Sequence, residues 1–171
     1  MIELKRLSPG DGRDVYELLQ QIPPEENGFE NSACGMNESQ FKDWLLRQDR
    51  MARGEGIAPW MVPQTTYWLY ADGVPVAIGK LRHRLTKRLQ ESGGHIGYAV
   101  RPGYRGLGYG KKLLAALLVE AAGLGIDRAL LTVRQDNLPS VAVAKHNGGR
   151  IEKCENGRYW IWVACAGGKD G

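Results

Sequence analysis

Apolar and polar residues follow two spacings along this chain, one typical of helices and one typical of strands. Apolar side chains three or four residues apart predict helices, because such residues share one face of an α-helix. The predicted helices are 14–22, 38–52, 111–125 and 140–149. Runs rich in β-branched and aromatic residues, alternating or continuously apolar, predict strands. The predicted strands are 2–8, two runs within 65–85, 93–100, 128–134 and two runs within 150–165.

Turn signals join these segments and set their order. Asp72-Gly73 and Asn156-Gly157 favour two-residue hairpin turns, whereas residues 23–37 and 54–64 are predicted to be loops. The order βααβββαβαββ predicts an α/β fold with a mixed, partly parallel central sheet flanked by helices. With 171 residues and 43% hydrophobic content, the chain is predicted to form a single domain over residues 1–166, followed by a short flexible tail at 167–171.

Composition narrows the classes of function. Lys and Arg total 23 against 19 Asp and Glu, and this net charge of +4 comes without a recognition motif, so no nucleic-acid partner is expected. No window approaches the roughly 18 apolar residues of a membrane span, so a cytoplasmic protein without a membrane partner is expected. Cys34, Cys154 and Cys165 are far apart and have no histidine at ligand spacing, which predicts no metal site.

Residues 100–114, VRPGYRGLGYGKKLL, place a glycine-rich turn between a predicted strand and a predicted helix. Free backbone N–H groups at a helix N-terminus bind phosphate. A Walker loop is excluded because Arg105 and Lys112 stand where it needs a glycine and a hydroxyl. The dinucleotide fingerprint is excluded because the last three glycines of the turn are spaced by two.

The spacing that remains, RxxGxG at Arg105, Gly108 and Gly110, resembles the pyrophosphate-binding motif of the GCN5-related N-acetyltransferase (GNAT) superfamily. The element order is similar too, and residues 65–98 with KHNGG resemble a little-characterised bacterial branch. The resemblance implies a GNAT-like fold, acetyl-CoA as co-substrate, and two strands that separate to admit the pantetheine arm. The cofactor-binding residues that it implies are Tyr98, Val100, Arg105, Gly106, Leu107, Gly108, Tyr109, Gly110, Lys111, Asn137 and Ser140. For Asn137, simple capping of the following helix is the alternative.

Acetyl transfer to an amine requires that the amine lose a proton and that the departing thiolate be stabilised. His95 is the candidate base, with a hydrogen-bonded structural histidine as the alternative. The tyrosine that many GNAT relatives use as the acid is replaced here by Ala144. The candidates to replace it are Tyr98, Tyr109, Tyr104, His146 and a water molecule.

The acceptor site is expected near the first two predicted helices. Residues expected to shape it, or else to belong to the core, are Trp60, Tyr67, Trp68 and Arg84. Lys80, Arg82 and Arg84 alternate onto one face of a predicted strand. This pattern predicts either a solvated face or a surface that attracts an acidic substrate or a cofactor phosphate.

Together these features predict an acetyl-CoA-dependent N-acetyltransferase that transfers the acetyl group directly to a primary amine of a small molecule or peptide. A covalent cysteine intermediate is not expected, because no cysteine lies near the predicted cofactor segments. Ala144 leaves one alternative, a non-catalytic acyl-CoA-binding module that retains the loop. The resemblance also implies a homodimer, in which residues 159–165 form an interface strand or remain core.

Overall fold

The hairpin of β4 (Gln64–Ala71) and β5 (Val74–Arg82) lies at the centre of the main sheet. Its turn residues, Asp72 and Gly73, have φ of 49° and 80°, as a two-residue hairpin turn with left-handed residues requires. β1 (Ile2–Arg6) pairs with β4 and β6 (Ile96–Val100) pairs with β5, in the antiparallel order β1-β4-β5-β6. This computed structural model describes residues 1–165, so the tail predicted at 167–171 lies outside the described residues.

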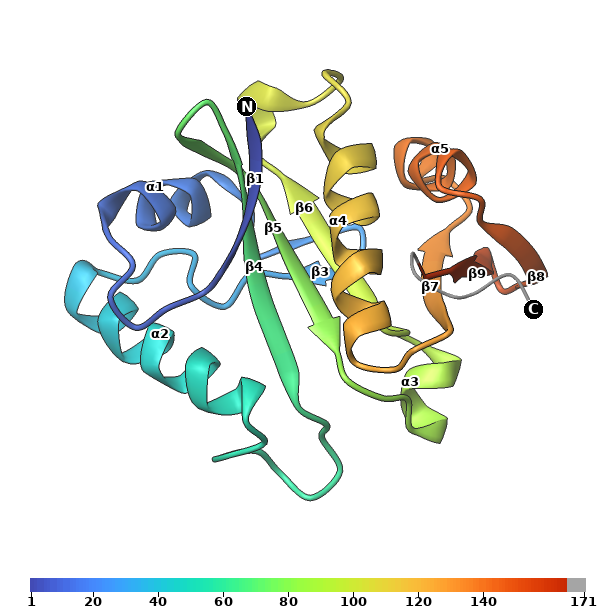
Figure 1. Ribbon diagram of the computed structural model, residues 1–171, viewed down its shortest axis with the longest axis horizontal. Helices are drawn as coiled ribbons and strands as arrows, with labels where there is room; N and C mark the ends of the chain where they lie inside the picture. Colours follow the sequence, from blue (N-terminus) through green and yellow to red (C-terminus); the bar gives the residue numbers. More distant parts are fainter. Residues whose placement is uncertain (166–171) are drawn as a thin grey trace.

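Helices cover both faces of the main sheet (Figure 1). α1 (Arg13–Gln21) and α2 (Glu38–Ala52) bury Trp68 and Ile78 on one face. α4 (Tyr109–Gly123) buries Leu69 and Leu81 on the other. Because successive strand residues point to opposite faces, one pair of strands supplies both cores. These helices and strands were predicted from the sequence.

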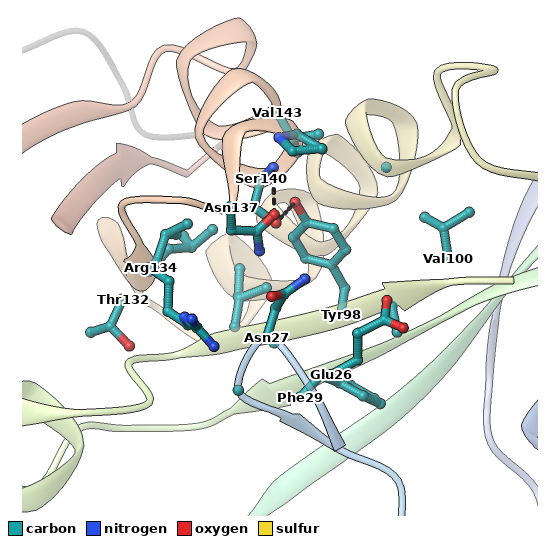
Figure 2. A pocket seen from close by; sticks show the side chains of 18 of the residues that line it. Glu26, Asn27, Phe29, Tyr98, Val100, Thr132, Arg134, Asn137, Ser140 and Val143 are labelled. Carbon is teal, nitrogen blue, oxygen red and sulfur yellow. Dashed lines mark hydrogen bonds between the residues drawn. The ribbon is translucent and has the colours of Figure 1, made fainter. Parts of the chain in front are cut away.

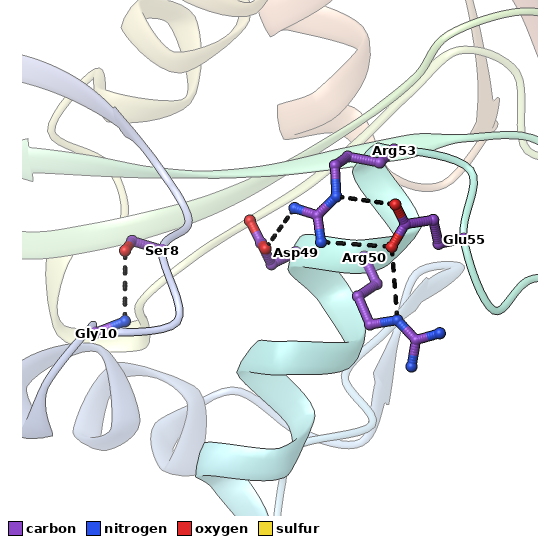
Figure 3. Close-up of polar contacts among 6 residues, drawn as sticks. All are labelled: Ser8, Gly10, Asp49, Arg50, Arg53 and Glu55. Atoms are coloured by element: carbon purple, nitrogen blue, oxygen red, sulfur yellow. Dashed lines mark hydrogen bonds and ion pairs between the residues drawn. The ribbon is translucent and has the colours of Figure 1, made fainter.

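Surface ion pairs fix the end of α2 (Figure 3). Arg53 pairs with Asp49 at 2.6 Å and with Glu55 at 3.3 Å, and Arg50 lies 3.7 Å from Glu55. Exposed pairs of this kind contribute little stability individually. Their effect is to hold the turn that leads from α2 toward β4.

A second sheet follows α4 along the chain. β7 (Arg128–Arg134), β9 (Arg158–Ala164) and β8 (Arg150–Glu155) form it in the antiparallel order β7-β9-β8, and α5 (Leu138–His146) follows β7. β9 is therefore the middle strand, with its backbone paired on both sides. The segment 159–165, for which an interface strand and core were the two expectations, supplies the buried side chains of Trp160, Ile161 and Val163.

β6 and β7 lie together at one end only. The backbone N–H of His95, just before β6, donates to the carbonyl oxygen of Leu130 in β7 at 2.8 Å. No ladder joins the two strands within residues 1–165, where every ladder is antiparallel. A crossover through α4 connects β6 and β7, and such a connection usually joins parallel neighbours, so the predicted parallel pairing was expected here. They separate instead, as the predicted pantetheine slot requires.

Four short elements were not predicted. They are β2 (Glu25–Glu26), β3 (Phe29–Glu30), α3 (Lys87–Glu91) and the 3₁₀ turn η1 (Pro102–Tyr104). Elements of two to five residues are too short to show a hydrophobic period. The one available signal was Asn27-Gly28, whose φ values of 52° and 87° form the β2–β3 turn. Among the described residues, no helix is long and apolar enough to cross a membrane.

Candidate active site

A cavity of about 550 Å³ opens where β6 and β7 separate (Figure 2). Its walls are β5, β6, β7, the start of β9, α5, the loop before α4 and the β2–β3 hairpin. The predicted cofactor-binding residues that line it are Tyr98, Val100, Arg105, Gly106, Gly108, Tyr109, Gly110, Lys111, Asn137 and Ser140. Leu107 is the exception, because its side chain is 63% exposed and does not line the cavity. The structure thus brings together residues that are far apart in the sequence.

The loop before α4 presents a row of unpaired backbone N–H groups. Gly106 and Gly108 have φ of 76° and 86°, in the left-handed region that favours glycine. Gly108 is the N-cap residue of α4, and no side chain caps this helix. Within the described chain no hydrogen bond reaches the N–H groups of residues 106–111, and helical bonding begins with Lys112 N–H to Gly108 O at 3.3 Å. Such donors at the positive end of a helix form a binding site for phosphate.

Two contacts hold this loop in place. A Cβ at Gly110 would lie 3.2 Å from Cγ2 of Val143, so glycine allows α4 to approach α5 closely. The Nε of Arg105 donates to the carbonyl oxygen of Val100 at 3.0 Å, and its Nη2 forms an ion pair with Glu26 at 2.5 Å. Arg105 therefore ties the loop to β6 and to the β2–β3 hairpin.

Tyr98 links β6 to α5 across the cavity. Its hydroxyl lies 3.0 Å from Oγ of Ser140, and burial raises the pKa of Tyr98 above its usual value. Asn137 caps α5, because its Oδ1 accepts the Ser140 N–H at 3.4 Å. The cap leaves the amide nitrogen of Asn137 without a hydrogen bond in the described chain, at the cavity wall shown in Figure 2.

Comparison with known proteins agrees with this geometry. A sequence model described as the Acetyltransferase (GNAT) family matches residues 13–148. The chain belongs to the GNAT acetyltransferase family. A search of curated proteins found no match.

Solved GNAT structures share the fold at low sequence identity. The Campylobacter jejuni N-acetyltransferase PseH in complex with acetyl-CoA is 14% identical, over 96% of this chain and 99% of that chain, with a TM-score of 0.64. RimL, a ribosomal L7/L12 α-N-protein acetyltransferase in complex with coenzyme A, is 17% identical over 94% and 92%, with a TM-score of 0.69. Mutant forms of the Vibrio cholerae spermidine/spermine N-acetyltransferase SpeG are 14% identical over 98% and 97%, with a TM-score of 0.62.

His95 lies at the end of the cavity where β6 and β7 meet, and it does not line the cavity. Its side chain is buried, and its Nδ1 accepts the Leu130 N–H at 2.9 Å. Burial and the nearby Arg82 lower the pKa of His95 to about 4, so the ring is neutral at pH 7. With one ring nitrogen occupied and a low basicity, His95 fits the structural alternative better than that of a base facing the acceptor.

Lys80 and Arg82 face the cavity from β5. Lys80 Nζ donates to the carbonyl oxygen of Glu30 at 2.6 Å and lies 4.6 Å from the centre of the Phe29 ring. Burial, and then the neighbouring Arg82, lower the pKa of Lys80 to about 8. Arg82 Nη1 donates to the carbonyl oxygens of Gly93 and Gly94, each at 3.2 Å, and burial lowers the pKa of Arg82.

The four residues expected to shape the acceptor site do not line this cavity. Trp68 and Tyr67 are buried in the two cores, Trp60 is 62% exposed, and neither Trp60 nor Arg84 lines the cavity. The β2–β3 hairpin contributes Glu26, Asn27 and Phe29 to the cavity wall. Sequence reasoning missed this hairpin because its strands have two residues each. No cluster of three His, Cys, Asp or Glu side chains in residues 1–165 is arranged to hold a metal ion.

Proposed function

We propose that this GNAT protein transfers the acetyl group of acetyl-CoA directly to a primary amine of a small molecule or peptide. The observation that carries the proposal is the row of free N–H groups at residues 106–111, which opens onto the slot between β6 and β7. The loop suits a pyrophosphate, and the slot suits an extended arm that leads from it. Acetyl-CoA has both parts and is the co-substrate implied by the family.

The free edge of β6 orients the donor. β6 pairs with β5 on one side only, so its other edge offers unpaired backbone N–H and C=O groups to the amides of pantetheine. A β6 N–H group beside the thioester would also polarise its carbonyl. Positioning supplies much of the rate when the acyl group is already activated as a thioester.

Tyr98 is the residue that we assign as acid. Ser140 and Ala144 are one turn apart on α5, and therefore share a face of that helix. The hydroxyl of Tyr98, 3.0 Å from Ser140 Oγ, thus lies within one turn of the position where the family resemblance implies a tyrosine. Tyr98 reaches this region from the facing strand. Tyr109 also lines the cavity, but at the phosphate loop, so we place it at the cofactor.

The reaction needs one bond to form and one to break. The neutral amine attacks the thioester carbon, the C–N bond forms, and the C–S bond then breaks. Tyr98 protonates the departing sulfur, and its own proton is restored from solvent. The proton that the amine loses passes to water, because His95 is turned into the protein and bonded to Leu130.

Initial rates with acetyl-CoA and an amine varied together test the proposal. Direct transfer in a ternary complex gives intersecting lines in a double-reciprocal plot. Parallel lines would indicate a covalent acetyl-enzyme and would contradict direct transfer. The alternative of a non-catalytic acyl-CoA-binding module rests on Ala144, and it predicts that acetyl-CoA binds without turnover of any amine in a broad panel. A homodimer and a cytoplasmic location stay predictions.

A further inference from the structure

Three cations in the cavity form no direct ion pair, although the Glu30 carboxylate acts on two of them, Lys80 and Arg82, from a longer distance. Of the charged residues in its lining, Arg105 pairs with Glu26 and Arg134 pairs with Asp136. Lys111 belongs to the phosphate loop. The cations that remain are Lys80, Arg82 and Arg158, and no carboxylate of the described chain lies within 4.0 Å of their nitrogens.

These cations lie at the end of the slot away from the phosphate loop. Arg82 and Arg158 flank the same short segment, because Arg82 binds the carbonyls of Gly93 and Gly94 while Arg158 Nη1 donates to Ser92 Oγ at 2.7 Å. This segment leads into the start of β6, whereas the phosphate loop follows the end of β6. β6 has five residues, so at about 3.3 Å per residue roughly 13 Å separate its ends. One pyrophosphate bound at the loop therefore does not reach these cations.

Lys80 and Arg82 also face the side of β6 opposite to the pantetheine wall. Lys80 pairs in register with Gly97, and a Cβ at Gly97 would point toward Phe29 of the β2–β3 hairpin. Figure 2 shows Phe29 and Asn27 on the opposite side of β6 from Ser140. An acceptor that approaches the thioester from the hairpin side thus meets Lys80 and Arg82 first.

Arg82 is positioned to bind an anion. Its Nη1 is fixed by two carbonyls, while its Nε and Nη2 have no hydrogen bond in the described chain. A guanidinium held in this way can donate the remaining N–H groups in parallel to a carboxylate or a phosphate. Partly buried charges are unfavourable unless they are paired. Glu30 acts on Arg82 only from a distance, and an anionic ligand would supply a direct partner.

We propose that Lys80, Arg82 and Arg158 form a subsite for an anionic group on the acceptor, which is therefore a small amine that also carries a carboxylate or a phosphate. This inference rests on the proposed acetyl transfer and specifies its substrate class. Of the alternating cations Lys80, Arg82 and Arg84, the first two, in β5, then form a substrate-attracting surface. Arg84 lies beyond the end of β5 and is exposed to solvent.

Matched amines test the subsite. Glycine and 4-aminobutyrate are compared with glycinamide and butylamine, and phosphoethanolamine with ethanolamine, by kcat/KM at saturating acetyl-CoA. The anionic member of a pair should be favoured by about tenfold or more, since a charged hydrogen-bonded contact is worth that factor. Preference among the amino acids identifies a carboxylate, and preference for phosphoethanolamine alone identifies a phosphate. Equal rates within every pair would overturn the subsite while leaving acetyl transfer intact.

Variants that remove one charge test which residues cause the preference for anionic amines. Arg82→Gln and Lys80→Gln should each lower kcat/KM for the anionic amine about tenfold to a hundredfold, with little change for the neutral analogue or for the KM of acetyl-CoA. Arg84→Gln removes the same charge two residues away, outside the cavity, and should leave the preference unchanged. Equal losses for both members of a pair would contradict the assignment.

A binding measurement separates this inference from the proposed function. Calorimetry of 4-aminobutyrate and phosphoethanolamine with the coenzyme A complex should show binding to the wild type that Lys80→Gln weakens about tenfold. If no amine turns over but this pattern is found, acetyl transfer fails and the anion subsite stands. If neither anion binds to the wild-type complex, the subsite is overturned. Because Arg82 also supports the segment at Gly93, the midpoint of thermal unfolding is compared for each variant.

Discussion

The hydroxyl of Tyr98 lies 3.0 Å from Oγ of Ser140, across the cavity between β6 and α5. Replacing Tyr98 with Phe should lower kcat by roughly tenfold to a hundredfold, toward the lower end of general acid catalysis because a thiol is a good leaving group. The KM for acetyl-CoA should change little. Ser140→Ala is the matched control, since it removes the partner and keeps the tyrosine hydroxyl. A kcat for Tyr98→Phe equal to that of the wild type would remove the acid role.

Gly108 should control affinity for coenzyme A. Its φ of 86° is costly for alanine, by about 1 kcal/mol, and the strain would fall on the loop that presents the N–H groups. Gly108→Ala should therefore raise the Kd for coenzyme A by about fivefold or more, measured by calorimetry. Gly103 lies in the same connection without a left-handed φ and with nothing near its missing Cβ, so Gly103→Ala is the control. Similar Kd values for the two variants would argue against the phosphate loop.

Gly94 should be essential for closing the slot at its narrow end. A Cβ there would lie 2.3 Å from the carbonyl oxygen of Leu130, and φ is 62°. Gly148 has a φ of 85° and open space around it, so Gly148→Ala measures the conformational cost alone, about 1 kcal/mol. Gly94→Ala should lower the free energy of unfolding by several kcal/mol in urea denaturation. Equal losses would show that β6 and β7 are not in contact at this point.

His95 should make stability depend on pH. Its pKa is lowered from 6.5 to about 4 in the folded protein, so between these values the unfolded state binds the extra proton. The contribution of neutral His95 to the free energy of unfolding is therefore complete above pH 6.5. It is lost as the pH falls toward 4, by a total of about 3 kcal/mol. His95→Asn retains a side-chain acceptor for Leu130 and does not titrate. Its stability should vary less than that of the wild type between pH 6.5 and 4, measured by urea denaturation, and parallel curves would contradict the burial of His95.

Helices and strands long enough to show a regular hydrophobic pattern could be predicted from the sequence. The glycine-rich loop before α4 could be predicted too. The stripe of α4 and the Asp72-Gly73 turn are local signals, and RxxGxG is a local motif. The cavity wall formed by β2 and β3 could not be predicted in the same way, because it depends on where a hairpin with two-residue strands packs. Trp60 and Trp68 illustrate the difficulty, since an aromatic side chain does not reveal from sequence whether it is core, surface or site. His95 was predicted to lie on the strand but lies just before β6, and its direction is set by Leu130, a partner 35 residues away.

The most direct test of acetyl transfer uses acetyl-CoA that carries a deuterated acetyl group, incubated with the protein and the amine panel. Mass spectrometry of the amines then follows the label. We predict an amide product that carries the intact deuterated acetyl group and forms only when the protein is present. Label that remains on coenzyme A, or that appears only as free acetate, would contradict it.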